Sequence, residues 1–234
     1  MNKIGLIFAM HEELEESFKY FEEKNKFNVF DLLFYEGYIN GVYVVMVECG
    51  IGKVNAARTT QILIDNLKVD YIINVGVAGG VSSDLSVGDL VIATGLVQHD
   101  FDITSFGHEK GYITGVGKVI DSDTYLSELF YEKALDMNLD VGVFKGIIAS
   151  GDIFCTDVNM SKKINQKFGA LCVEMEGASI AQVCYLCHIP FLVIRAISDV
   201  VNDKNNVDFD LFLKSSSSMV SNVLVRVISS INVD

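Results

Sequence analysis

The sequence predicts an α/β fold, a three-layer sandwich with helices on both faces of a central mixed β-sheet. Three observations support this prediction. Short apolar runs alternate with segments of helical periodicity along most of the 234 residues. Asn40-Gly41 separates two β-rich runs, which predicts a hairpin and therefore a sheet that is not purely parallel. Hydrophobic residues make up 50% of the chain, enough for a large core.

The N-terminal part combines a buried strand, a helix and the hairpin. Lys3 to Ala9 is a short apolar run typical of a buried strand. His11 to Glu23 is expected to form a helix, because its early glutamates suit the positive end of a helix dipole. Phe30 to Tyr38 and Val42 to Cys49 flank the predicted turn and are the two expected hairpin strands.

The same alternation continues to the end of the chain. Further strands are predicted over Tyr71–Val75, Leu90–Val97, Val143–Ala149 and Phe191–Ile197. Further helices are predicted over Ala56–Leu67, Ser122–Met137, Ser161–Phe168 and Met175–Cys187. A final helix is predicted from one apolar stripe, made of Phe209, Phe212, Leu213, Met219, Val220, Val223 and Leu224. No repeat or linker interrupts this pattern, so we expect one domain over residues 1–234.

Charge and cysteine content restrict the class of protein. Lys and Arg number 18 and Asp and Glu 31, and the resulting net charge of −13 would repel nucleic acid and anionic membranes. No apolar stretch approaches the roughly 20 residues that cross a bilayer. The N-terminal apolar run ends at His11, so no secretion signal is indicated. Five cysteines, an odd number, are expected to be reduced core thiols, which indicates a cytoplasmic protein.

Four segments that follow predicted strands are candidates for a site. Acids and an arginine interrupt apolar sequence at Val173–Gly177 and Arg195–Asp199, where buried charge is costly without a partner or a purpose. Gly50–Lys53 and Gly76–Gly80 are glycine-rich, which either a bound ligand or a plain tight turn would explain. Ligands of such sheets bind beyond the carboxyl ends of the strands, so we expect these segments to meet in one crevice.

The glutamates after the first strand leave two interpretations open. They could form a solvated helix face, the usual fate of a run of like charges. The turn also places Glu12 or Glu13 at the carboxyl edge of the sheet, where one of them could point inward.

No metal and no cofactor is expected. Cys184–His188 matches the C-x-x-C-H pattern of covalent haem attachment, but that chemistry requires an exported chain. The motif lies near the end of an apolar helix, where thiols pack as small hydrophobes. The four histidines show no paired ligand spacing.

Taken together, six segments resemble one known family. They are Ala9–Glu13, Gly50–Lys53, Asn74–Gly80, Ser150–Phe154, Val173–Gly177 and Arg195–Asp199. With these segments in this order along the sequence, the chain closely resembles the bacterial 5′-methylthioadenosine/S-adenosylhomocysteine nucleosidases. The resemblance implies a nucleoside phosphorylase-like fold. It also implies a hydrolase of methionine salvage and amino-acid biosynthesis, one that releases adenine from these two nucleosides and from 5′-deoxyadenosine.

The resemblance implies catalytic roles for residues at two of these turns. Glu13, the second glutamate of its turn, would be the catalytic glutamate, and Glu12 a bystander. Asp199 would be the general acid, with Ser198 beside it and Arg195 near the attacking water.

Substrate contacts are implied in the same way. Within one chain, Met175 and Glu176 would contact the ribose. Phe154 and the Cys155 backbone would contact adenine, and Gly79 and Phe209 would also contact the ligand. In the homodimer that the resemblance implies, Ile103 and Phe106 would close the 5′ pocket of the neighbouring subunit.

These residue types suit cleavage of a ribosyl C1′–N9 bond. The reaction builds positive charge on the sugar and negative charge on the purine, so one group must protonate the base while another activates the nucleophile. Asp199 must therefore carry a proton, and burial must raise its pKa. We expect Asp199 to lie in a drier pocket than Glu13, which stays ionised and activates water.

Two rival functions remain to be compared. Purine or uridine nucleoside phosphorylases bind phosphate with arginines at two positions that hold Glu13 and Asn74 here, which favours water as the nucleophile. A nucleoside-binding protein without activity is disfavoured because Glu13, Glu176 and Asp199 are all present. Val77 and Thr114 depart from the family pattern, which leaves the preference among the three nucleosides open.

Overall fold

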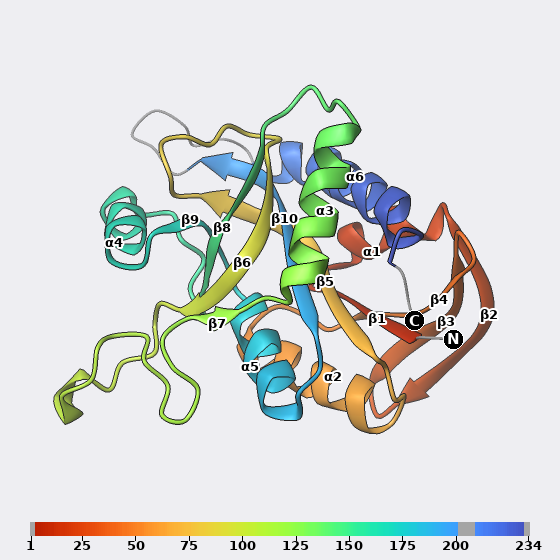
Figure 1. The fold of residues 1–234 in the computed structure, drawn as a ribbon, viewed down its shortest axis with the longest axis horizontal. Helices are drawn as coiled ribbons and strands as arrows, with labels where there is room; N and C mark the ends of the chain where they lie inside the picture. Colours follow the sequence, from red (N-terminus) through yellow and green to blue (C-terminus); the bar gives the residue numbers. More distant parts are fainter. Residues whose placement is uncertain (1–2, 201–208, 232–234) are drawn as a thin grey trace.

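The computed structural model describes residues 3–200 and 209–231, apart from the side chains of residues 209–211. One mixed sheet contains the ten strands of this part of the chain (Figure 1). These are β1 (Lys3–Phe8), β2 (Phe21–Val29), β3 (Leu32–Ile39), β4 (Val42–Glu48), β5 (Tyr71–Gly80), β6 (Leu90–Gln98), β7 (Ile120–Asp121), β8 (Val143–Ser150), β9 (Ala170–Glu174) and β10 (Phe191–Val200). The helices are α1 (His11–Phe18), α2 (Lys53–Asp65), α3 (Thr124–Asp136), α4 (Val158–Phe168), α5 (Gly177–Cys187) and α6 (Phe209–Ile228), with a short 3-10 turn η1 (Thr104–Phe106).

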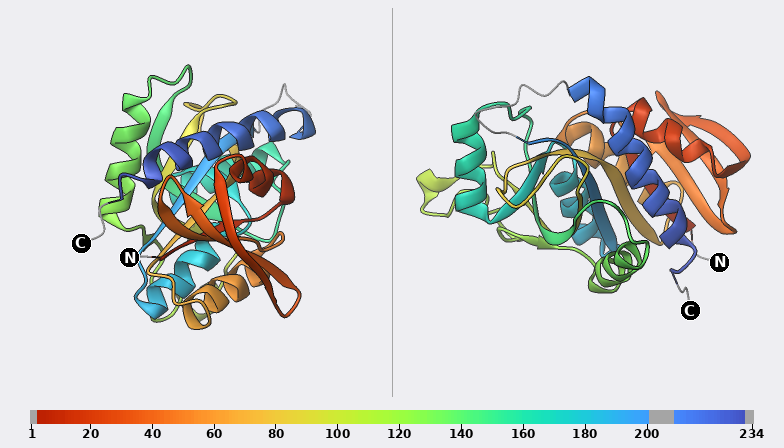
Figure 2. Two further views of the ribbon diagram at one scale, coloured as in Figure 1. Left: turned by 90° about the vertical axis from the view of Figure 1, so that its right-hand side faces the viewer. Right: turned by 90° about the horizontal axis from the view of Figure 1, so that it is seen from above.

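Helices cover both faces of the sheet, so the predicted three-layer α/β fold is confirmed. α2 and α5 pack on one face through Ala56, Leu63 and Ala181. α1, α3 and α6 pack on the other, where Phe130 and Leu224 are among the buried side chains. Figure 2 shows the strands lying between these two groups of helices.

The central strand β5 is shared by two parts of the sheet. β10 pairs with β5 from Ile72 to Gly80, in parallel. The other edge of β5 pairs with β1 only as far as Asn74, and with β9 only at Gly79 and Gly80. β9 pairs with β8, β8 with β6, and β6 with β10. The five strands β5, β9, β8, β6 and β10 therefore close into a ring. Between Asn74 and Gly79 this edge of β5 has no strand partner in the described part of the chain, and the candidate site lies there.

The predicted helix from His11 to Glu23 is too long. α1 ends at Phe18, and Phe21–Val29 forms the edge strand β2, which the sequence did not indicate. Apart from Phe21, Phe27 and Val29, this strand is exposed and largely charged or polar, so it lacks the apolar alternation that predicts a strand. Charges and a register irregularity near Glu23 are typical of an edge strand protected from further pairing.

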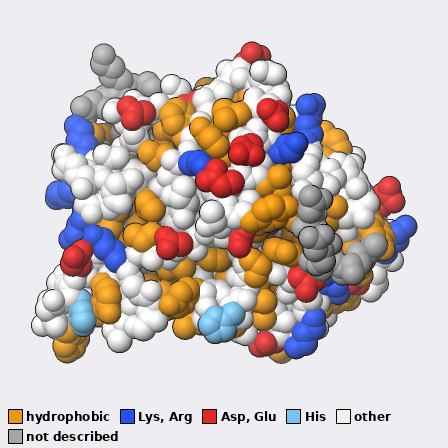
Figure 3. Space-filling model, in the orientation of Figure 1, with side chains coloured by type: hydrophobic (Ala, Val, Ile, Leu, Met, Phe, Trp, Pro, Cys, Tyr) orange, Lys and Arg blue, Asp and Glu red, His pale blue; other side chains and the backbone are white. Residues whose placement is uncertain are grey.

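None of the described helices combines the length and apolar composition needed to cross a membrane. Each of the five cysteines is a free thiol. On the face drawn in Figure 3, lysine and arginine side chains lie among acidic, apolar and neutral ones.

Candidate active site

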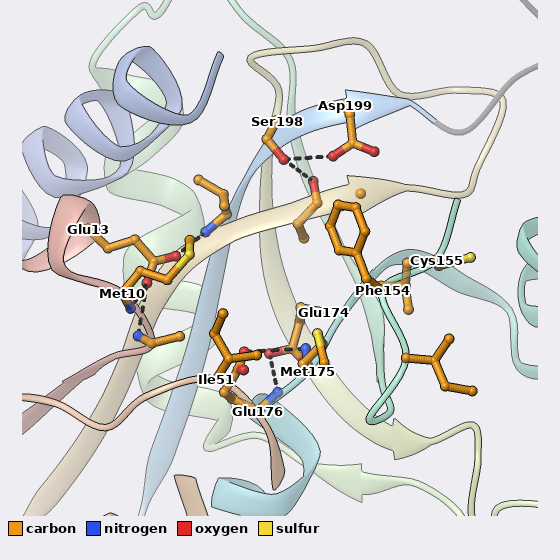
Figure 4. Close-up of a pocket in the computed structure, with 16 residues that line it drawn as sticks. Met10, Glu13, Ile51, Phe154, Cys155, Glu174, Met175, Glu176, Ser198 and Asp199 are labelled. Carbon is orange, nitrogen blue, oxygen red and sulfur yellow. Dashed lines mark hydrogen bonds between the residues drawn. The ribbon is translucent and has the colours of Figure 1, made fainter. Parts of the chain in front are cut away.

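A cavity of about 460 Å³ opens at the unpaired edge of β5. Its walls come from the turn after β1, from β5, from the segment after β8, from the turn between β9 and α5, and from the end of β10 (Figure 4). The lining residues are Ala9, Met10, Glu13, Ile51, Val77, Ala78, Gly79, Ile153, Phe154, Cys155, Val173, Glu174, Met175, Glu176, Ser198 and Asp199. The structure therefore brings the predicted carboxyl-end turns together.

Glu13 points into the protein from the first turn of α1, whereas Glu12 is exposed on the helix surface. Its Oε2 accepts the backbone N–H groups of Ala9 (2.9 Å) and Met10 (3.0 Å), and its Oε1 accepts that of Val77 (2.9 Å). The Val77 N–H belongs to the stretch of β5 without a strand partner, so the carboxylate takes the place of a neighbouring strand. Glu13 is the inward-pointing glutamate of this turn.

The close approach of Glu13 to β5 requires a glycine. A Cβ at Gly76 would clash with Glu13 Oε1. Any side chain at this position would displace the carboxylate, which explains one glycine of the Gly76–Gly80 segment without a ligand contact.

Asp199 lies across the cavity from Glu13, near the end of β10 (Figure 4). The register of β10 against β5 shifts between Ile197 and Asp199. The Ser198 hydroxyl donates to Asp199 Oδ1 over 2.8 Å. Burial raises the pKa of Asp199, and the Ser198 hydroxyl opposes that rise.

The prediction that Asp199 is drier than Glu13 is wrong. Glu13 is 3% exposed, whereas Asp199 is only partly buried. Burial raises the pKa of Glu13 as well, but the Arg195 guanidinium and the three backbone N–H groups oppose that rise. The two carboxyl groups thus differ in their donors and neighbouring charges, because the protein replaces water around Glu13 with fixed N–H groups.

Behind the cavity lies a buried ion pair that the sequence analysis did not assign. Glu174 Oε2 accepts a hydrogen bond from Arg195 (2.5 Å) and others from the backbone N–H groups of Glu176 (3.1 Å) and Gly177 (2.7 Å). Its other oxygen accepts the Ser150 hydroxyl. Glu174 therefore holds Arg195 and also caps the N-terminus of α5. An acid between an apolar strand and a helix is the signal that could have identified it.

Arg195 does not line the cavity, although it was predicted beside the attacking water. It is 1% exposed and also donates to the side chain and backbone oxygens of Asn74. Its positive charge still acts on Glu13 and Glu176. In each case the charge opposes the rise in pKa that burial causes.

Glu176 is the third buried carboxyl group. It is 5% exposed, and its Oε1 accepts the Gly52 N–H over 2.8 Å. Burial and the neighbouring Glu174 raise the pKa of Glu176 to about 8. A carboxyl group with this pKa is mostly protonated at neutral pH.

Most of the remaining predicted residues also line this cavity. Gly79, Phe154, Cys155, Met175 and Ser198 are all on its wall. The lining residues outside the predicted set are Ala9, Met10, Ile51, Val77, Ala78, Ile153, Val173 and Glu174. All of them except Glu174 are apolar, and an apolar residue near the end of a strand is too common a pattern to single out.

Two predicted contacts do not line the cavity within this chain. Ile103 and Phe106 lie in the segment 101–119, which extends away from the sheet (Figure 1), and Phe106 is 82% exposed. The side chain of Phe209, at the start of α6, lies outside the described residues. Of the two positions that depart from the family pattern, Val77 lines the cavity and Thr114 is exposed away from it.

Within the described residues, no group of three or more His, Cys, Asp or Glu side chains is placed to hold a metal ion. The arrangement is instead an apolar cavity with carboxyl groups on separate walls, which suits acid–base chemistry on a small organic molecule.

The fold and this site define a class of protein. A family model described as the phosphorylase superfamily matches residues 3–229, so the chain belongs to that superfamily. A 5′-methylthioadenosine/S-adenosylhomocysteine nucleosidase of Geobacillus sp. (strain WCH70) is 39% identical over 230 residues, which are 98% of this chain and 99% of that protein. Within the superfamily, the chain belongs to the 5′-methylthioadenosine/S-adenosylhomocysteine nucleosidases, which are N-glycosyl hydrolases.

Solved structures agree with this assignment. The S-adenosylhomocysteine nucleosidase of Streptococcus pyogenes, in complex with 5-methylthiotubericidin, matches with a TM-score of 0.93 and 34% identity over 99% of this chain and 98% of that one. The Neisseria meningitidis 5′-methylthioadenosine/S-adenosylhomocysteine nucleosidase, in complex with methylthio-immucillin-A, matches with a TM-score of 0.93 and 34% identity over 99% of this chain and 100% of that one.

Proposed function

We propose that this chain hydrolyses the N-glycosidic bond of 5′-methylthioadenosine and S-adenosylhomocysteine, and also that of 5′-deoxyadenosine. The products would be adenine and the 5-substituted ribose. The observation that carries the proposal is the placement of Glu13 and Asp199 on separate walls of one apolar cavity, with Glu176 also on its wall.

The proposed roles follow from the surroundings of each carboxyl group. Burial raises the pKa of Asp199, and within the described part of the chain the Ser198 hydroxyl alone opposes that rise, so Asp199 is suited to hold a proton and give it to the purine. Glu13 is surrounded by N–H donors and faces the Arg195 charge, so it is suited to stay ionised and to activate water at C1′. The transition state then places the cationic sugar near a carboxylate and the developing purine anion near an acid.

The remaining lining residues suit the proposed substrate. Phe154 and Cys155 are apolar groups that would hold adenine, while Met175 and Glu176 would hold the ribose. The Glu176 carboxyl group can accept hydrogen bonds from sugar hydroxyls whether or not it carries a proton, and its loss would weaken binding more than chemistry.

Water suits the cavity better than phosphate as the nucleophile. Three buried carboxyl groups, those of Glu13, Glu174 and Glu176, surround a single buried guanidinium, that of Arg195. Even with Glu176 protonated, a phosphate dianion would meet the two carboxylates of Glu13 and Glu174 against one guanidinium, at short range and in a medium of low dielectric constant. A nucleoside phosphorylase is therefore the weaker candidate.

The proposal extends to the assembly and the setting of the enzyme. We expect residues 1–234 to form one nucleosidase domain and to act as a homodimer, in which Ile103 and Phe106 of each subunit close the 5′ pocket of the other. The large exposed area of Phe106 supports a protein contact there. Free cysteines support a reducing, cytoplasmic setting, and the proposed role is in methionine salvage and amino-acid biosynthesis.

The direct test is adenine release from the three nucleosides in phosphate-free buffer. We expect adenine and free 5-methylthioribose from 5′-methylthioadenosine, at a rate that added phosphate does not change. A requirement for phosphate, with a ribose 1-phosphate as product, would show that the chain is a phosphorylase.

A further inference from the structure

Three residues outside the cavity form a closed set of hydrogen bonds around the N-terminus of α2. Lys53 Nζ donates to Asp100 Oδ1 over 2.7 Å. Asp100 Oδ2 accepts the backbone N–H of Asp152 over 2.9 Å, and Asp152 Oδ1 accepts the backbone N–H of Lys53 over 2.8 Å. None of the three lines the cavity. The set joins the ends of β4, β6 and β8, three elements far apart in sequence.

Lys53 is unfavourably placed for the helix that it begins. It is the first residue of α2, where the positive end of the helix dipole disfavours a cation. The Lys53 side chain is only 17% exposed and its ammonium group lies against Asp100, whose side chain is 19% exposed, so the pair is largely removed from water. A residue that breaks a local rule in this way is expected to serve something other than the stability of its own helix.

The segments that this set joins carry residues on two sides of the cavity. Gly52, directly before Lys53, donates its N–H to Glu176 on the proposed ribose side. Phe154 and Cys155, just after Asp152, are on the proposed adenine side. Phe154 lies two residues after Asp152, so the path of this segment affects where the ring lies. Asp100 fixes that path through the Asp152 N–H.

We propose that Lys53 is a positioning residue. Through Asp100 it would hold two groups in a fixed position relative to each other: the Gly52 N–H, which donates to Glu176, and the segment that carries Phe154. This inference rests on the proposed function, because it assigns the two linked segments to ribose and adenine. Charge-assisted hydrogen bonds of this kind are strong enough to hold a binding site in its productive geometry. Lys53 itself touches neither the substrate nor the reacting atoms.

The test compares Lys53→Met, Asp100→Asn and the double variant with wild type. The matched control is Lys145→Met, which removes another short lysine–carboxylate pair, with Glu128 at 2.6 Å, away from the cavity. For each protein, KM and kcat for 5′-methylthioadenosine, the inhibition constant of adenine and the melting temperature are measured in phosphate-free buffer.

We expect either single change to raise KM and the adenine inhibition constant by about tenfold, with a smaller fall in kcat, because binding geometry is lost before chemistry. The double variant should be no worse than Lys53→Met alone, since both changes break one set of contacts. Lys145→Met should behave as wild type. If Lys53→Met fails to fold, Asp100→Asn alone decides.

A KM within about twofold of wild type in both single variants, or effects that multiply in the double variant, would overturn the positioning role. An inactive wild type would instead contradict the proposed function, so the two failures are distinguishable.

Discussion

At the scale of residues, hydrogen-bond donors distinguish the two catalytic candidates better than burial does. Glu13 is the more buried, yet three backbone N–H groups and the Arg195 guanidinium stabilise its charge. Asp199 is less buried but accepts only the Ser198 hydroxyl among the hydrogen bonds described for it. A carboxyl group with few donors keeps its proton more easily. This difference supports the proposed roles of Glu13 as the base and Asp199 as the acid.

The raised pKa of Glu176 predicts how the stability of the protein depends on pH. Its pKa is about 8 in the folded protein, against an ordinary value of 4.5 for a glutamate in water, so between these values the folded state holds a proton that the unfolded state releases. The contribution of Glu176 to the free energy of unfolding is therefore full below pH 4.5 and is lost as the pH rises to about 8.

Replacing Glu176 by Gln removes this titration. We expect the melting temperature of wild type to fall relative to that of Glu176→Gln as the pH is raised from about 5 to about 9. The matched control is Glu12→Gln, which changes an exposed glutamate of α1 and should parallel wild type. Parallel melting curves for wild type and Glu176→Gln would contradict the raised pKa.

At the scale of elements, local patterns predicted most strands and helices but not how the sheet closes. The β3–β4 hairpin and the apolar strands β1, β5, β8 and β10 have patterns that the sequence itself displays. β2 and β9 were missed because one is a polar edge strand and the other has only five residues. The closed ring depends on pairing Gly79 with Val173, a contact between distant segments that no local pattern encodes.

The candidate site was predictable to a similar degree. The rule that ligands bind beyond the carboxyl ends of the strands predicted which turns meet at the cavity. The family resemblance then selected Glu13 and Asp199 among their residues. The rule could not assign Glu174, because its partners Arg195 and Ser150 become neighbours only in the folded sheet. It also could not reveal that N–H groups, rather than water, surround Glu13.

At the scale of the whole molecule, the proposed dimer shares each site between two chains. The residues proposed to hold adenine and ribose line the cavity within one chain. The segment 101–119, with the exposed Phe106, extends away from the sheet (Figure 1), and none of its residues lines the cavity of its own chain. An exposed aromatic residue of this kind is typical of a contact with another protein surface.

Mixing two defective chains tests the shared site. Phe106→Ala should raise KM by about tenfold, the effect of losing ~1.4 kcal/mol of contact, while Asp199→Asn should be inactive. In a mixed dimer, the Phe106→Ala chain keeps Asp199 and receives an intact Phe106 from its partner, so a fraction of sites with the wild-type KM should appear. A mixture that shows only the kinetics of Phe106→Ala would contradict the shared site.

The central claim is that a proton on Asp199 and the charge on Glu13 act together on a nucleoside bound between them. The most direct measurement is the turnover and the 5′-methylthioadenosine affinity of Asp199→Asn in phosphate-free buffer. We expect kcat to fall by ~10²–10⁴ while affinity stays close to that of wild type, because Asn keeps the shape but cannot supply the proton. A kcat near that of wild type would contradict the claim.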